Sequence, residues 1–213
     1  MTAETEPGTH DFTVVSTADV HIGRVVAMRV DEVVMPGGSI ARREVVEHLG
    51  AVAVVALDDE GAVTLIHQYR HPLRRRLWEL PAGLLDVDGE APVDTARREL
   101  LEEAGLTAQR WEVLVDTAAS PGFTDEVVRV FLARDLSPVE RHLPAEDEEA
   151  DLVVHRVPLP EAVRMALSGV LVNGSTVAGV LAAHAVLAGA GQTRPADTPW
   201  PDRPSTFARR GGA

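Results

Sequence analysis

Three glutamates in one short segment place the strongest constraint on how this chain can fold. Glu99, Glu102 and Glu103 stand at positions i, i+3 and i+4, so on a helix they share one face. Pro92 suits the first turn of that helix, where its missing N–H would be unpaired anyway, and Gly105 suits the left-handed residue that ends it. Like charges at this spacing cost about 0.2–0.5 kcal/mol per pair. The face is therefore either a solvated acidic surface or a site for a hard cation, which prefers oxygen ligands.

The residues around the glutamates favour the cation site. Residues 83–106 read GLLDVDGEAPVDTARRELLEEAGL, and this segment resembles the Nudix box, G-x5-E-x7-R-E-U-x-E-E-x-G-U, where U is an aliphatic residue. Gly83, Glu90 and Arg98 fill further positions of the pattern. Six residues rather than five separate Gly83 from Glu90. The additional residue falls in the turn before the helix, so we expect a longer turn with the glutamates unmoved relative to one another.

The resemblance implies a Nudix hydrolase, which cleaves a nucleoside diphosphate linked to another group. By motif position, Glu99 and Glu103 are expected to be the main metal ligands, and Glu102 to bind a metal directly or through water. The backbone carbonyl of Ala82 is expected to join them. Arg98 is expected to hold the carboxylates in place, as groups behind metal ligands commonly do. The implied cofactor is Mg2+, with Mn2+ as an alternative.

The general base implied by the resemblance lies far downstream of the box. In Nudix enzymes that act on ADP-ribose it stands on a loop, and the acidic cluster from Glu146 to Asp151 is the counterpart here. Alignment on the following strand favours Glu148 as the base, with Glu149 second and Asp151 third. The same residues could instead form a solvated acidic loop, and the sequence leaves both interpretations open.

Several segments resemble the ADP-ribose pyrophosphatase subgroup in particular. Pro121 stands about 15 residues after the box, as a proline does in that subgroup. Arg70 is a candidate for charge-assisted bonds to the diphosphate, and Glu79 for polar contacts with the substrate. Phe123 and Trp78 could stack on a base or pack in the core. The resemblance implies hydrolysis of ADP-ribose to AMP and ribose 5-phosphate. Alternatives are another nucleoside diphosphate sugar, such as GDP-mannose, and a non-catalytic nucleotide-sensing module.

Composition excludes several other classes of protein. The formal net charge is −13 and no broad basic patch stands out, so nucleic acid is an unexpected partner. The chain contains no cysteine, which excludes disulfides and thiol catalysis. No apolar run reaches the roughly 18 residues of a membrane-spanning helix, and no secretory signal is recognisable. A cytoplasmic protein without membrane attachment is therefore expected.

Apolar and β-branched runs outline the elements. Strands are expected over residues 12–15, 22–35, 39–48, 51–57, 62–69, 77–80, 111–118, 127–133 and 152–157. Helices are expected from Pro92 to Gly105, over 160–168 and over 175–188, with Ser175 as the N-cap of the last. Element order alone indicates only a mixture of α and β. The resemblance implies an α/β/α sandwich with a mixed sheet.

The same pattern predicts three regions. Residues 1–49 form an N-terminal β-meander, which is too small to bury both faces alone and is implied by the resemblance to be exchanged across a homodimer. Residues 50–191 form the catalytic domain. Residues 192–213 are rich in proline and arginine and are expected to be a flexible tail.

Overall fold

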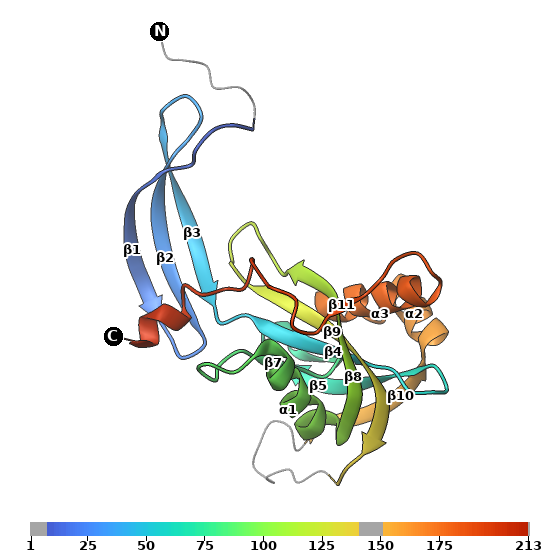
Figure 1. The fold of residues 1–213 in the computed structure, drawn as a ribbon. Coiled ribbons are helices and arrows are strands. Elements are labelled where there is room, and N and C mark those ends of the chain that lie inside the picture. Colours follow the sequence, from blue (N-terminus) through green and yellow to red (C-terminus); the bar gives the residue numbers. More distant parts are fainter. Residues whose placement is uncertain (1–7, 141–150, 213) are drawn as a thin grey trace. The chain divides into compact units, whose positions relative to one another are not determined.

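The computed structural model describes residues 8–140 and 151–212 (Figure 1). The chain divides into two compact units. The larger unit comprises residues 50–119 and the described part of 127–203, and the smaller comprises the described residues up to 49, residues 120–126 and those from 204 onward. The predicted regions 1–49, 50–191 and 192–213 stay predictions.

The larger unit contains a five-stranded mixed sheet with the order β11-β8-β9-β4-β7. β4 runs parallel to β9, whereas the other neighbouring strands pair in the antiparallel sense. The strands are β4 (Ala51–Ala56), β7 (Ala82–Leu84), β8 (Leu106–Ala118), β9 (Val127–Pro138) and β11 (Arg194–Pro195).

A second, antiparallel sheet in this unit has the order β10-β5-β6. Its strands are β5 (Ala62–Arg70), β6 (Arg75–Glu79) and β10 (Val153–Pro158). The short 3-10 helix η1 (His71–Leu73) connects β5 to β6 and ends at Arg74, which adopts a left-handed conformation with φ 51°. Three successive arginines, Arg74 to Arg76, follow η1 at the end of the β5–β6 hairpin.

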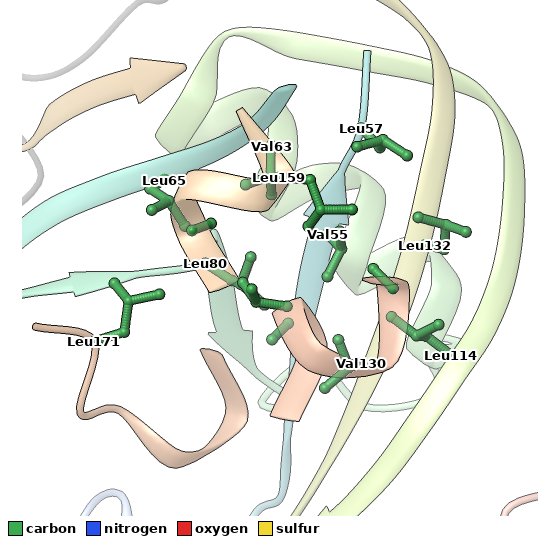
Figure 2. Packing of buried hydrophobic residues seen from close by; sticks show 14 of the residues in the cluster. Val55, Leu57, Val63, Leu65, Leu80, Leu114, Val130, Leu132, Leu159 and Leu171 are labelled. Atoms are coloured by element: carbon green, nitrogen blue, oxygen red, sulfur yellow. The ribbon is translucent and has the colours of Figure 1, made fainter. Parts of the chain in front are cut away.

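Alternate side chains of β4 enter different hydrophobic cores, which explains why its sequence is apolar throughout. Ala53 and Val55 belong to the core that α2 (Leu159–Leu167) and α3 (Gly174–Leu187) cover, and Figure 2 shows Val55 there beside Val130 and Leu159. Val52 and Val54 belong to the core on the side of α1 (Pro92–Ala104). Helices thus cover both faces of the mixed sheet (Figure 1), and the predicted α/β/α sandwich is confirmed.

The start, end and buried face of α1 agree with the sequence pattern. Pro92 is the first helical residue, and Gly105 ends the helix with φ 64° and ψ 36°. Its N–H donates to the carbonyls of the last turn, which satisfies acceptors that would otherwise be unpaired. Ala96 and Leu100 are fully buried in the α1-side core. The helix is therefore held by its apolar stripe, and Glu99 and Glu103 lie next to that stripe and are buried as well.

The predicted N-cap of α3 is wrong by two residues. Asn173, not Ser175, is the N-cap, and its side chain accepts a hydrogen bond from the backbone N–H of Thr176 over 2.9 Å. Ser175 instead donates its hydroxyl to the same Asn173 oxygen. Asparagine and serine are both favoured caps, and the local pattern alone did not decide between them.

The smaller unit contains a three-stranded antiparallel sheet with the order β1-β2-β3. Its strands are β1 (Val14–Ile22), β2 (Val26–Val34) and β3 (Ile40–His48), and the C-terminal 3-10 helix η3 (Ala208–Gly212) belongs to the same unit. The predicted boundary between the first two strands is wrong, because the chain turns at Gly23, whose N–H donates to the carbonyl of Val26. The β-branched residues on both sides of Gly23 hid this turn.

A buried carboxylate ties η3 to this small sheet. Glu47 on β3 is fully buried and pairs with both Arg29 and Arg210. Arg210 also donates two hydrogen bonds to Asp19 on β1, over 2.8 and 2.9 Å. Hydrogen bonding from Arg210 lowers the pKa of Glu47 and outweighs burial, which alone would raise it. One arginine near the C-terminus thereby links β1 to β3.

A buried arginine ties residues 194–200 to the five-stranded sheet. Arg129 on β9 is 2% exposed and donates to the carboxylate of Asp116 on β8 over 2.7 Å. It also donates to the carbonyl of Thr198 over 2.7 Å, and its guanidinium lies 4.5 Å from the ring centre of Trp200. Trp200 packs against the α1-side core. The flexibility expected of residues 192–213 stays a prediction.

We predict that Arg129→Leu lowers the free energy of unfolding by about 3–5 kcal/mol, because Asp116 then loses its main partner in a largely buried setting. The control is Arg110→Leu. Arg110 pairs with Asp135 at the same 2.7 Å, but both side chains are exposed, so its loss should cost under about 1 kcal/mol. Urea unfolding followed by circular dichroism measures both, and equal losses would contradict the assignment.

Candidate active site

The three glutamates on α1 occupy two different environments. Glu99 and Glu103, one helical turn apart, are only 7% and 5% exposed. The side chain of Glu102 is 45% exposed. The helical spacing thus places two carboxylates against the protein and one at its edge. In a uniformly solvated acidic face all three side chains would be exposed, whereas here two of them are buried.

Gly83 on β7 makes room for the carboxylate of Glu99. A Cβ atom built on Gly83 would lie 2.0 Å from Oε1 of Glu99, a distance that atoms cannot occupy. The neighbouring Ala82 donates its backbone N–H to Oε2 of Glu103 over 2.8 Å. Ala82 and Gly83 are held in place by pairing with Ala53 and Val52 of β4. The first residues of the box and its glutamates therefore meet, although they are far apart along the sequence.

Arg98 lies among four carboxylates. It donates from Nη1 to Glu99 over 2.7 Å and to Glu102 over 3.2 Å, and from Nη2 to Glu90 over 3.4 Å. Asp86 lies 3.8 Å from the same nitrogen. Burial alone would lower the pKa of Arg98, but the hydrogen bond with Glu90 and the surrounding negative charges raise it. The guanidinium is therefore permanently charged and gathers the acids of the box around itself.

Thr95 is a member of this cluster that the sequence analysis missed. It is fully buried, and its hydroxyl donates to Glu90 over 2.7 Å. This hydrogen bond lowers the pKa of Glu90, and Arg98 lowers it further against the opposing effect of burial. Thr95 stands four residues before Glu99, so the helical spacing was a signal that could have identified it.

The donor atoms at this site are of the type that a hard divalent cation binds. Glu99, Glu102, Glu103 and the carbonyl of Ala82 all offer oxygen, the ligand that Mg2+ and Mn2+ prefer. The space that Gly83 leaves beside Glu99 admits no side chain. Among residues 8–140 and 151–212, no group of three or more aspartate, glutamate, histidine or cysteine side chains has an arrangement that could hold a metal ion. Two of the glutamates instead pair with Arg98.

Arg70 and Glu79, both predicted to contact the substrate, pair with each other. Glu79 ends β6, is 1% exposed and accepts hydrogen bonds from Nε and Nη2 of Arg70 over 3.1 and 2.6 Å. It also accepts one from Gln68 over 3.2 Å. The side chain of Arg70 is 44% exposed. A buried acid thus fixes the orientation of a partly exposed cation, and Gln68, two residues earlier on β5, was missed.

The aromatic and acidic candidates belong to different parts of the chain. Trp78 stacks on His67 with ring centres 4.4 Å apart and packs against the α2–α3 core, as the packing interpretation expects. Pro121 and Phe123 belong to the smaller unit. Glu148 and Glu149 lie outside the described residues. Asp151, the third choice for the base, pairs with Arg76.

Phe123 lines a cavity of about 450 Å3 in the smaller unit. The residue is 56% exposed, and its backbone carbonyl accepts a hydrogen bond from Val46 over 2.7 Å. The other lining residues are Val30, Arg42, Arg43, Glu44 and Gly122. Two arginines and an exposed aromatic ring are a combination that suits an anionic, planar ligand.

Comparison with known proteins agrees with this geometry. Residues 46–174, more than half of the chain, match the family model described as NUDIX domain. An ADP-ribose pyrophosphatase of Mycobacterium tuberculosis (strain H37Rv) is 56% identical over 201 residues, which cover 94% of this chain and 97% of that protein. An ADP-ribose pyrophosphatase of Bacillus subtilis (strain 168) is 39% identical over 162 residues, 76% of this chain and 86% of that protein.

A solved structure described as an ADP compounds hydrolase shares the fold. The two structures superpose with a TM-score of 0.70 and share 22% sequence identity. The matched region covers 85% of this chain and 97% of the hydrolase chain. The resemblance inferred from residues 83–106 is confirmed, and the chain belongs to the NUDIX domain family.

Proposed function

We propose that this protein hydrolyses the diphosphate bond of ADP-ribose, yielding AMP and ribose 5-phosphate, with Mg2+ as its cofactor. The observation that carries the proposal is the contact between Gly83 and Glu99, because it brings the first glycine of the Nudix box on β7 against the glutamates on α1. The similarity to two proteins named ADP-ribose pyrophosphatase supports this choice of substrate over other nucleoside diphosphate sugars.

The residues that would hold the cation are Glu99, Glu103, Glu102 and the carbonyl of Ala82. A bound Mg2+ or Mn2+ would neutralise charge on the diphosphate oxygens and lower the pKa of the attacking water. Arg98 balances the repulsion among the carboxylates and holds Glu99 and Glu102 by direct hydrogen bonds. Its loss would free these side chains to rotate, so we assign it a positioning role.

Other residues would bind the substrate and activate the water. Arg70, oriented by Glu79, offers charge-assisted hydrogen bonds to the diphosphate. Phe123 stacks on the base, with Pro121 shaping its loop. Glu148 accepts the proton of the attacking water as general base, with Glu149 and then Asp151 as the alternatives.

We also propose a homodimer in the cytoplasm. Every residue of β1 is exposed, including Val14, Val20 and Ile22, and an exposed apolar edge strand is a ready surface for association. Within the part of the chain that the structure describes, no helix is long and apolar enough to cross a membrane.

Hydrolysis in 18O-labelled water with Mg2+ tests the function. We expect ADP-ribose to be cleaved with a higher kcat/KM than GDP-mannose and other nucleoside diphosphate sugars, and one 18O atom to appear in AMP or in ribose 5-phosphate. The labelled product identifies the phosphorus that is attacked. Absence of cleavage, or a clear preference for GDP-mannose, would refute the proposed substrate.

Replacement of Gly83 tests the metal site. A methyl group in Gly83→Ala displaces the carboxylate of Glu99, so we expect the Mn2+ dissociation constant to rise about 10- to 100-fold. Electron paramagnetic resonance of free Mn2+ measures it. The control is Gly191→Ala, because a Cβ there meets no atom within 4 Å. If both variants bind Mn2+ equally well, Glu99 is not a ligand.

Replacement of Glu148 tests the general base. Glu148→Gln should lower kcat about 100-fold or more, because the amide cannot accept the proton, and Mn2+ affinity should be unchanged. Glu149→Gln is the matched comparison and should have the smaller effect. An unaltered kcat in Glu148→Gln would remove this residue from the reaction.

The oligomeric state tests the role of β1. We expect light scattering at micromolar concentration to give twice the chain mass, and Val20→Asp on β1 to shift it toward the monomer, because a charge on an apolar contact is costly to bury. A fully active monomer in the wild type would contradict the proposed dimer.

A further inference from the structure

The β5–β6 hairpin places two arginines directly opposite each other. Arg70 ends β5 and Arg75 begins β6, and their Cα atoms are partners in the antiparallel register. Residues in this relation project to the same face of the sheet, with Cβ atoms about 4.5–5.5 Å apart. Like charges at such positions destabilise a sheet. The repulsion between Arg70 and Arg75 therefore has to be offset by a nearby negative charge.

The charge of Arg70 is balanced within the hairpin, whereas that of Arg75 is not. Glu79 accepts hydrogen bonds from both Nε and Nη2 of Arg70. Arg75 is exposed, and none of the acidic side chains that the structure describes pairs with it. Among these residues, the positive charge of Arg75 is therefore uncompensated, although the net charge of the chain is −13.

Neighbouring arginines differ from Arg75 in ways that make them useful comparisons. Arg76 projects to the opposite face of β6, because successive residues of a strand alternate, and it pairs with Asp151. Arg74 precedes the strand and ends η1 in a left-handed conformation. Only Arg75 of the three shares a face of the sheet with Arg70 and Glu79.

That face points away from α2 and α3. Leu65 and Trp78 project from the other side of the hairpin and pack with the core beneath these helices. Gln68, Arg70, Arg75 and Glu79 alternate with them and so lie together on the remaining face. Arg75 thereby extends the polar cluster that was assigned to substrate binding.

We propose that Arg75 binds a phosphate group of the nucleoside diphosphate substrate together with Arg70. This inference rests on the proposed function. A phosphate between two guanidinium groups accepts charge-assisted hydrogen bonds from both, and its attraction to each outweighs their mutual repulsion. Because Glu79 neutralises Arg70, Arg75 supplies the net positive charge of this site.

The test is the variant Arg75→Gln compared with Arg74→Gln. We expect the KM for ADP-ribose to rise about 5- to 10-fold in Arg75→Gln, the loss of one charged hydrogen bond, with kcat within about twofold. Arg75→Lys should recover part of the difference, because it retains the charge without the planar fork. Melting temperature should stay the same or rise, because removing Arg75 relieves the repulsion with Arg70.

Product inhibition identifies the phosphate that Arg75 contacts. A raised inhibition constant for AMP in Arg75→Gln assigns the contact to the phosphate next to adenosine, and a raised constant for ribose 5-phosphate assigns it to the other. Inhibition by adenosine, which has no phosphate, should be unchanged. If neither phosphorylated product is affected, or if Arg74→Gln has the same KM as Arg75→Gln, the inference about Arg75 is refuted.

The two proposals fail in different ways. A wild-type protein that does not cleave ADP-ribose overturns the proposed function and the role of Arg75 with it. A wild-type protein that cleaves ADP-ribose, with an unchanged KM in Arg75→Gln, leaves the function intact and refutes only the role of Arg75.

Discussion

The close approach of the Gly83 backbone to the carboxylate of Glu99 is the contact on which the proposed chemistry depends. The position of β7 is fixed by its pairing with β4. The position of α1 is fixed by Ala96 and Leu100, which pack in the same core as Val52 and Val54 of β4. Where the two elements meet, no Cβ atom fits beside Glu99. The pairing of β7 with β4 and the packing of α1 on the same strand therefore decide where the carboxylate oxygens of Glu99 and Glu103 lie.

Paired acids and arginines recur at several polar sites of this chain. Arg98 holds the box carboxylates, Glu79 holds Arg70, and Glu47 holds Arg29 and Arg210. At the last two sites the buried acid fixes the orientation of the more exposed arginine. Arg75 is one of several arginines that pair with none of the described acids, and it differs from the others because it stands directly opposite Arg70 in the sheet.

Local patterns predicted the elements that depend on a few neighbouring residues. The first residue of α1, its glycine end and its buried stripe followed from proline, glycine and helical spacing. The same reasoning did not find the turn at Gly23 or the N-cap at Asn173. At both places the neighbouring residues are compatible with more than one local structure. That reasoning also missed Arg129, because the partners of that side chain lie on β8 and in residues 198–200.

The sequence by itself determined the family and the helix that carries the glutamates, because a motif with many positions and helical periodicity are both local patterns. The order of layers followed only from the family resemblance that this motif carries. Only the tertiary structure decided that Glu99 and Glu103 are covered while Glu102 is not, and that Arg70 turns to Glu79. Helical and strand periods set the directions in which side chains point relative to one another. Which of those directions meets another part of the protein depends on packing between distant segments, and no local pattern contains that information.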